Sequence, residues 1–258
     1  MTETKDLKLA VLIDADNIPS AHIEGMLEEI AKFGIPTIKR IYGDWTSSRV
    51  SGWKTSLLEH AIIPIQQYGY TRGKNSTDSA MIIDAMDILH SEKVDGFCIV
   101  SSDSDFTRLA MRIRESGKLV IGIGEKKTPQ PFIVACDKFI YIEIIASTDQ
   151  ETEEKKSKDG ASTTRRPAQK QKVDRIDKSF LRLLKRSVDD VEDDDGWASL
   201  AAVGALINKK KPDFDPRNYG FSKLSTLIKS LNKQLELDER KDQRSGAKHI
   251  YLRMKKPS

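Results

Sequence analysis

Short β-branched segments alternate with helical patterns along the first 146 residues, and this alternation limits the possible folds more than any other feature. The predicted strands are nearly all apolar, and they are residues 8–13, 36–42, 62–67, 96–101, 118–123 and 139–144. The predicted helices lie near residues 20–33, 49–60, 77–91, 105–116 and 130–136. Apolar strands separated by helices are typical of a parallel sheet that is covered on both faces. The sequence therefore predicts an α/β domain over residues 1–146.

The remaining residues divide into a polar segment and a second compact region. Residues 147–172 are rich in Ser, Thr, Lys and Glu and contain no aromatic side chain, so we expect a flexible linker that cannot bury enough surface to become ordered. Residues 173–258 contain three helical patterns, near 174–188, 198–209 and 221–232, and then two strand-like runs, LELDER and HIYLRM. Three helices and a hairpin predict a small winged helix-turn-helix domain.

Composition and charge exclude several classes of protein. No apolar run approaches the ~20 residues that a membrane span needs, and we expect no signal peptide in the first residues. Two cysteines cannot build a disulfide framework or a Cys-based zinc site, so we expect a soluble cytoplasmic protein. Residues 1–150 carry a net charge of −4 and residues 151–258 carry +8. This asymmetry suggests a metal site beside an anion-binding module, although ordinary charge scatter is the simpler alternative.

Carboxylates gather at the ends of predicted elements in the first domain. Some follow the first strand, some lie on the helix near 77–91, and some follow the fourth strand. The acids are Asp14, Asp16, Asp78, Asp84, Asp103 and Asp105, and the amide of Asn17 lies beside the first group. In an open parallel sheet, ligands bind at the carboxyl ends of the strands, where the strand order reverses. The usual order 3-2-1-4-5 makes the first and fourth strands neighbours at that point. We therefore expect Asp14 and Asp103 to lie together.

Such a cluster of acids predicts a divalent cation, because like charges raise one another's pKa. Mg²⁺ takes oxygen ligands and often adds phosphate oxygens of a substrate, and such ions can prepare a water for attack on a phosphodiester. Each acid also has a structural interpretation. Asp78 and Asp105 could cap helices, and Asp84 lies on the apolar side of its helix, where a carboxylate needs a partner. Arg72 and Lys74, in the loop before Asp78, could contact a phosphate backbone, or form a solvated basic loop.

The motifs VLIDADN, STDSAMIIDAMD and VSSDSDFTRLA resemble the NYN family, the LabA-like branch of the PIN-like ribonucleases, over roughly residues 8–145. The third motif is the most specific, because it is similar to the family's S-G-D-S-D-F element, with Ser102 where glycine is common. The resemblance implies a PIN-like, Rossmann-like fold and Mg²⁺- or Mn²⁺-dependent cleavage of RNA. Asn17 and Asp16 would support the site. The metal-binding acids implied by the resemblance are Asp14, Asp78, Asp103 and Asp105, of which the first three would be catalytic.

Residues 174–254 resemble the OST-HTH (LOTUS) domain, through GWASLAAVGALINKKKPDFDPRNYGFSKLSTLI and the closing hairpin. Its helices present apolar faces that would form a core. The resemblance implies binding of RNA, or docking of a protein partner, rather than catalysis. The candidates for phosphate contact are Lys209, Lys210, Lys211, Arg217, Lys223, Lys229, Arg244 and Lys248. Lysines on helix ends that are merely solvated are the alternative.

Three functions are compatible with these features. The motifs favour a metal-dependent endoribonuclease whose tethered second domain raises the local concentration of RNA. The second possibility is a catalytically silent adaptor that binds RNA or proteins. The third is a haloacid-dehalogenase-like phosphatase, since Asp14 and Asp16 have its nucleophile-x-acid spacing, although Asn17 and Ile18 depart from its usual continuation.

Overall fold

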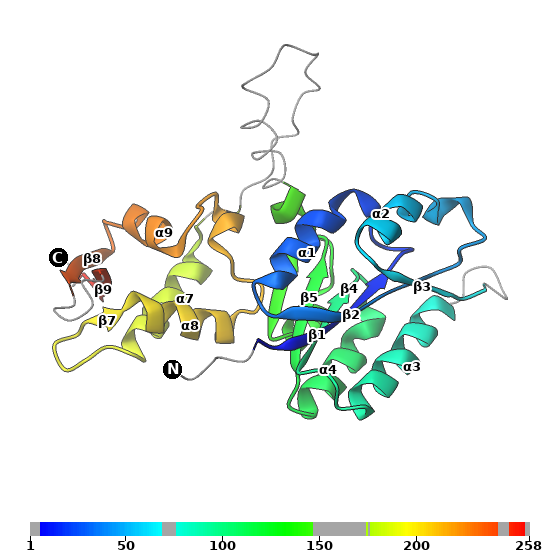
Figure 1. Ribbon diagram of the computed structural model, residues 1–258. Helices are drawn as coiled ribbons and strands as arrows, with labels where there is room; N and C mark the ends of the chain where they lie inside the picture. The colour runs from blue at the N-terminus through cyan, green and yellow to red at the C-terminus, as the bar shows by residue number, and fades with distance from the viewer. Residues whose placement is uncertain (1–5, 69–75, 147–173, 175, 242–247, 256–258) are drawn as a thin grey trace, which may run out of the picture. The chain divides into compact units, whose positions relative to one another are not determined.

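The structure is a computed structural model that describes residues 6–68, 76–146, 174, 176–241 and 248–255. The chain divides into two compact units, Met1–Arg166 and Pro167–Ser258, and each is described by itself (Figure 1). The predicted linker lies outside the described residues. Within the described ranges, no helix is long and apolar enough to cross a membrane.

A six-stranded parallel sheet forms the centre of the first unit (Figure 1). Its strands are β1 (Lys8–Asp14), β2 (Ile35–Gly43), β3 (Ile63–Gln66), β4 (Gly96–Val100), β5 (Leu119–Gly124) and β6 (Lys138–Tyr141). They lie in the order β3-β2-β1-β4-β5-β6, which confirms the predicted α/β class and the pairing of the first and fourth strands. The chain leaves β1 toward β3 and then crosses back to β4, so the strand order reverses between β1 and β4.

Helices cover both faces of this sheet. They are η1 (Ser20–His22), α1 (Ile23–Ala31), η2 (Ser48–Val50), α2 (Trp53–Glu59), α3 (Ser76–His90), η3 (Ser104–Phe106), α4 (Thr107–Glu115) and α5 (Gln130–Ala135). Alternate residues of each strand enter two separate cores. On β1, Ala10 and Leu12 pack in the core that includes α3, α4 and α5, whereas Val11 and Ile13 pack in the core that includes α1 and α2. Burial on both faces explains why the strands are apolar throughout.

The sixth strand is shorter than the sequence predicts. The predicted strand covers residues 139–144, but β6 ends at Tyr141 and residues 142–146 are helical. Ile142 and Ile144 are both buried, in different cores. A short apolar run does not by itself distinguish a strand from a buried helical segment, and the isoleucines here occur in the helical one.

In its described residues, the second unit contains three α-helices, one 3-10 helix and a three-stranded antiparallel sheet, which confirms the predicted helical region with a small sheet. Its elements are α7 (Lys178–Asp189), β7 (Ala198–Ser199), α8 (Leu200–Lys210), η5 (Pro216–Tyr219), α9 (Leu224–Ser230), β8 (Leu235–Lys241) and β9 (Lys248–Met254). The sheet order is β7-β9-β8. The sequence does not predict β7, because two residues are too few to carry a pattern.

Polar side chains cap α7 and α8 and set where these two helices begin. The carboxylate of Asp177 accepts a hydrogen bond from the Phe180 amide at 2.8 Å, so α7 begins at Lys178 rather than at the predicted residue 174. The hydroxyl of Ser199 accepts from the Ala202 amide at 3.2 Å and starts α8 in the same way.

Candidate metal centre

The carboxyl ends of β1 and β4 bring together acids from three stretches of the chain. Asp14 is the last residue of β1, Asp103 and Asp105 follow β4, and Asp78 lies in the first turn of α3. One carboxylate oxygen from each of Asp78, Asp103 and Asp105 lies within 4.8 Å of the others. Asp14 is close enough for its charge to raise the pKa of Asp78. One edge of the sheet therefore carries at least four neighbouring carboxylates.

The carboxylate of Asp14 is buried and held by its own chain. Its Oδ2 accepts hydrogen bonds from Asn17 Nδ2 at 2.6 Å and from Ser101 Oγ at 2.8 Å, and its Oδ1 accepts from the Asp16 amide at 3.1 Å. Burial raises the pKa of Asp14, whereas these hydrogen bonds act in the opposite direction because they stabilise the ionised form. Asn17 thus holds the Asp14 carboxylate with its side chain, and Asp16 holds it with its backbone amide.

Ser101 joins the two strand ends. Its buried hydroxyl donates to Asp14 and accepts from the Asp103 amide at 3.1 Å. Ser101 is not among the site residues predicted from the sequence, because one serine after a strand carries no spacing signal. Its place two residues before Asp103, in the SSDSD motif, is the signal that could have identified it.

The loop after β4 is fixed by two further side chains. The Oδ1 atom of Asp103 accepts from the Asp105 amide at 2.9 Å and caps η3, so the predicted alternative role of Asp105 as a cap belongs to Asp103. The Ser102 hydroxyl accepts from the Glu125 amide at 2.9 Å, which ties this loop to the end of β5. These bonds fix the carboxylate of Asp103 and the backbone of the loop that carries both acids.

The carboxyl group of Asp78 is the titratable centre of the cluster. Its pKa is raised to about 6, chiefly by burial and then by the negative charges of neighbouring acids, which are Asp14, Asp103, Asp105 and Asp16. A bound cation relieves such repulsion, and hard divalent ions prefer carboxylate oxygens. The donor set therefore fits a divalent metal ion. The hydroxyl of Thr77, one residue before Asp78, donates to Asp16 Oδ2 at 3.2 Å and joins the start of α3 to the loop after β1.

Asp84 lies further along α3 and has other partners. Its carboxylate pairs with the guanidinium of Arg40 and accepts a hydrogen bond from the hydroxyl of Tyr42. Burial and this hydrogen bond raise the pKa of Tyr42, so the phenol remains a donor. Asp84 is not among the acids that raise the pKa of Asp78. The structure therefore gives it a role in holding α3 against β2.

Replacing Asp84 by alanine is expected to lower the free energy of unfolding by about 1–3 kcal/mol, because Arg40 and Tyr42 lose the acceptor that they share. Urea unfolding followed by circular dichroism measures this loss. Asp87→Ala, at an exposed position on the same helix, is the matched control and should change stability by less than about 0.5 kcal/mol. An equal loss in both variants would contradict the role assigned to Asp84.

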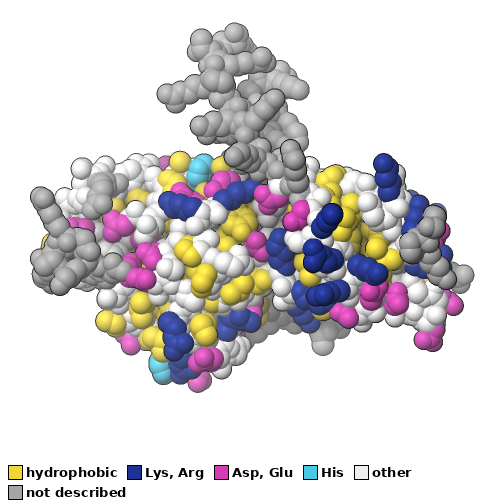
Figure 2. Space-filling model, turned by 180° about the vertical axis from the view of Figure 1, so that it is seen from behind, with side chains coloured by type: hydrophobic (Ala, Val, Ile, Leu, Met, Phe, Trp, Pro, Cys, Tyr) yellow, Lys and Arg dark blue, Asp and Glu magenta, His cyan; other side chains and the backbone are white. Residues whose placement is uncertain are grey.

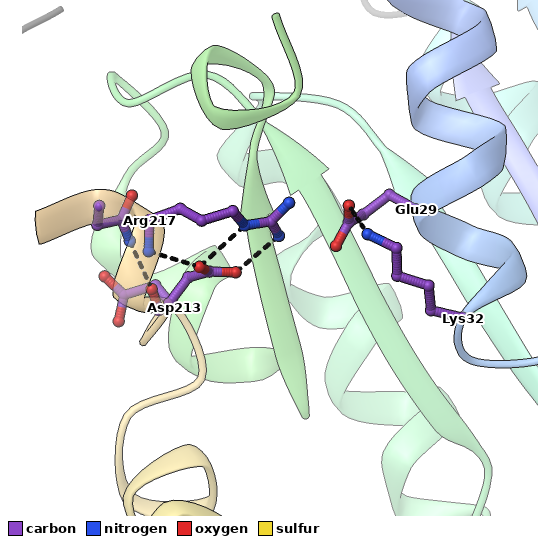
Figure 3. Close-up of polar contacts among 6 residues, drawn as sticks. Glu29, Lys32, Asp213 and Arg217 are labelled. Atoms are coloured by element: carbon purple, nitrogen blue, oxygen red, sulfur yellow. Dashed lines mark hydrogen bonds and ion pairs between the residues drawn. The ribbon is translucent and has the colours of Figure 1, made fainter. Parts of the chain in front are cut away.

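The predicted phosphate contacts of the second unit differ in their availability. Exposed positions are occupied by Lys209, Lys223 and Lys248. Ion pairs with acids of the same unit involve Lys210 with Asp190, Arg217 with Asp215 and Lys229 with Glu239. Figure 3 shows the Arg217 side chain with dashed lines to its polar partners. Lys211 is half-buried and donates to the Tyr219 hydroxyl at 3.3 Å, so it belongs to the core packing. Arg72, Lys74 and Arg244 lie outside the described residues.

Helix α7 carries a basic stripe that the sequence analysis does not single out. Its members are exposed and recur at i, i+4, i+7 and i+8, and they are Lys178, Arg182, Lys185 and Arg186. Phe180 and Leu184 are buried on the other side of the helix. A groove of about 580 Å³ lies beside the stripe, lined by Arg182, Arg186 and Lys210 among others. Figure 2 shows Lys and Arg side chains gathered over the second unit.

Two family profiles match the chain. The NYN domain profile matches residues 8–143, which is more than half of the chain, and the OST-HTH/LOTUS domain profile matches residues 171–245. Their order along the chain is the order that the sequence motifs indicate. No curated protein matches the chain.

Solved structures resemble parts of the chain. A solution NMR structure of an uncharacterised Nitrosomonas europaea protein is 33% identical, covers 38% of this chain and 91% of its own, and has a TM-score of 0.31. A crystal structure of a Vibrio parahaemolyticus protein of unknown function is 22% identical, covers 55% of this chain and 96% of its own, and has a TM-score of 0.46. A solution NMR structure of a Chromobacterium violaceum protein is 29% identical, covers 34% and 91%, and has a TM-score of 0.27.

Proposed function

The chain belongs to the NYN domain family, whose members are PIN-like nucleases, and we propose from this premise that it is a metal-dependent endoribonuclease. The observation that carries the proposal is the group of carboxylate oxygens from Asp78, Asp103 and Asp105, which lie within 4.8 Å of one another. OST-HTH/LOTUS domains bind RNA, and the match to this domain supports RNA as the substrate and the second unit as the part that holds it.

Asp78, Asp103 and Asp105 would hold the ion, either Mg²⁺ or Mn²⁺. When bound, a divalent ion supplies an activated water and offsets negative charge on the phosphodiester. Asp14 adds a further negative charge beside this group, and hydrogen bonds from Asn17 and Ser101 keep its carboxylate fixed. The carboxyl of Asp78 must lose its proton before it can bind a cation, so its raised pKa makes metal affinity depend on pH.

The two alternatives fit the geometry less well. A haloacid-dehalogenase-like phosphatase needs a carboxylate oxygen of Asp14 as an open nucleophile. Here both oxygens of Asp14 accept hydrogen bonds, and the residue is 1% exposed. A catalytically silent adaptor does not need the cluster of acids, whose mutual repulsion opposes folding unless a cation binds.

The test of this proposal is cleavage of a labelled single-stranded RNA by the full chain in Mg²⁺, in Mn²⁺ and in EDTA. We expect internal cleavage in at least one of the metals and none in EDTA. RNA that is bound in a gel shift but remains intact in both metals would favour the adaptor. Cleavage that persists in EDTA would contradict a metal-dependent site.

Reversing two charges of the α7 stripe, with Arg182→Glu and Arg186→Glu together, is expected to weaken RNA binding by at least about tenfold. Loss of two phosphate contacts should also make the slope of log affinity against log salt shallower by about 1.4, at ~0.7 per contact for a single strand. Fluorescence anisotropy at several salt concentrations in EDTA measures both quantities without cleavage.

The matched control for the stripe reverses Lys233 and Lys241, which are exposed in the same unit but lie outside α7. This control makes the same change in net charge. Equal weakening in both double variants would show that total charge, and not the stripe, governs RNA affinity.

A further inference from the structure

A pocket of about 570 Å³ lies at the carboxyl ends of β2 and β3, on the same edge of the sheet as the acids. Its volume falls within the range of small-molecule sites in proteins. Its lining includes the apolar side chains of Trp45, Val50, Leu57 and Pro64. It also includes the polar side chains of Lys54 and Gln66. The pocket is separate from the group of acids, and the proposed chemistry does not use it.

Trp45 forms a fixed aromatic wall of this pocket. Its indole Nε1 donates to the Ile65 carbonyl at 3.1 Å, and its amide donates to Gln66 Oε1 at 2.9 Å. Gln66 in turn donates from Nε2 to Asp44 Oδ1 at 3.0 Å. Because these bonds use the indole N–H, the half-exposed ring offers a ligand its apolar surface. Aromatic surfaces of this kind stack with nucleobases of any sequence.

Lys54, on α2, supplies the positive charge of the pocket. It is exposed, and within the described ranges no carboxylate forms an ion pair with its ammonium group. A cation beside an aromatic surface suits a nucleotide, because the phosphate can approach the lysine while the base packs against the ring.

Close packing connects the pocket to the strand end that carries Asp14. A Cβ atom built on Gly43 would lie 3.0 Å from the Ala15 Cβ and 3.5 Å from the Val50 Cγ1. Ala15 directly follows Asp14, and Asp14 pairs in register with Tyr42, one residue before Gly43. Val50 lines the pocket, so Gly43 lies close both to the pocket wall and to the residue that follows Asp14.

We propose that this pocket binds one unpaired base of an RNA strand, on a nucleotide next to the phosphate held at the acids. The proposal rests on the proposed function and names its substrate class, which is single-stranded RNA with at least one base free to leave its neighbours. In an RNA duplex the bases are stacked and paired, so a duplex could not place a base against Trp45.

Abasic scanning tests the pocket directly. Each RNA in a set of single strands carries one abasic nucleotide, and binding is measured in Mg²⁺ with the full chain carrying Asp103→Asn, which blocks cleavage. We expect one position where loss of the base weakens binding about tenfold. Trp45→Ala should weaken binding of the intact RNA by a similar factor, and the two changes together should cause no further loss.

Two milder variants guard against misfolding. Trp45→Phe keeps an aromatic surface and should retain most of the affinity, and Lys54→Ala, at an exposed position, should weaken binding of the intact strand. If Trp45→Ala and the missing base weaken binding additively at every abasic position, the pocket is not a base site. An equal effect of Trp45→Ala on a perfect duplex would overturn it as well.

Failure of the pocket as a base site can be distinguished from failure of the proposed function. If the effects of Trp45→Ala and of one abasic position are not additive, but the wild-type protein cuts no RNA, the pocket is supported and the nuclease is contradicted. Metal-dependent cleavage by the wild type, with additive effects at every position, would support the nuclease and overturn the pocket.

Discussion

Asp103→Asn is expected to lower the rate of RNA cleavage by at least about 100-fold while the fold and RNA binding survive. The asparagine side chain retains an oxygen that can accept the Asp105 amide, so the cap of η3 is kept. It removes the negative charge that a divalent cation needs. Single-turnover cleavage of a labelled RNA measures the rate, and gel shift measures binding.

Asp87→Asn is the control for this prediction, because it makes the same chemical change at an exposed position of α3. Its cleavage rate should equal that of the wild type. If Asp103→Asn cleaves as fast as this control, Asp103 has no part in the mechanism.

Asp78→Asn is expected to stabilise the metal-free chain at neutral pH even though it removes a metal ligand. The folded-state pKa of Asp78 is about 6, above its ordinary value of 3.8, so the folded chain binds this proton more tightly than the unfolded chain does. The resulting stability is fully present below about pH 4 and is lost as pH rises through 6. At pH 7.5 the ionised group therefore opposes folding, on the order of 1 kcal/mol after allowance for solvent screening.

Thermal unfolding with and without Mn²⁺ measures both effects of Asp78→Asn. In EDTA at pH 7.5 the variant should unfold at a higher temperature than the wild type, and the difference should shrink at pH 4. Mn²⁺ should raise the unfolding temperature of the wild type, because it binds only the folded state, and should raise that of the variant much less. A variant that is less stable than the wild type in EDTA at pH 7.5 would contradict the repulsion among these acids.

The sheet of the first unit could be predicted because its strands are buried on both faces and so read as apolar runs between helices. The order of strands followed from the usual topology of such sheets. The end of β6 could not be predicted, because the isoleucines after Tyr141 are equally suited to a buried helix. Strand β7 is two residues long and exists only through its pairing with β9.

Part of the candidate site could also be predicted. Asp14 and Asp103 follow strands whose carboxyl ends meet, so their proximity follows from topology alone. The hydrogen bond from Ser101 to Asp14 joins residues 87 positions apart and depends on the register of β1 against β4, which no local pattern gives. Trp45 and Gln66 likewise meet only through the pairing of β2 with β3. The basic stripe of α7, by contrast, could have been predicted from the helical spacing of its lysines and arginines, although it was not.

Cleavage of a single-stranded RNA that carries a 2′-deoxy sugar at the mapped cleavage site would distinguish metal-dependent hydrolysis from attack by the RNA's own 2′-hydroxyl. A water prepared by metal-binding acids needs no 2′-hydroxyl, so we expect this strand to be cut in Mn²⁺ and not in EDTA, with a 5′-phosphate and a 3′-hydroxyl on the products. Cleavage that stops at the deoxy position, or that leaves a 2′,3′-cyclic phosphate, would contradict metal-dependent hydrolysis. An all-RNA strand that stays intact in Mn²⁺ would contradict the nuclease itself.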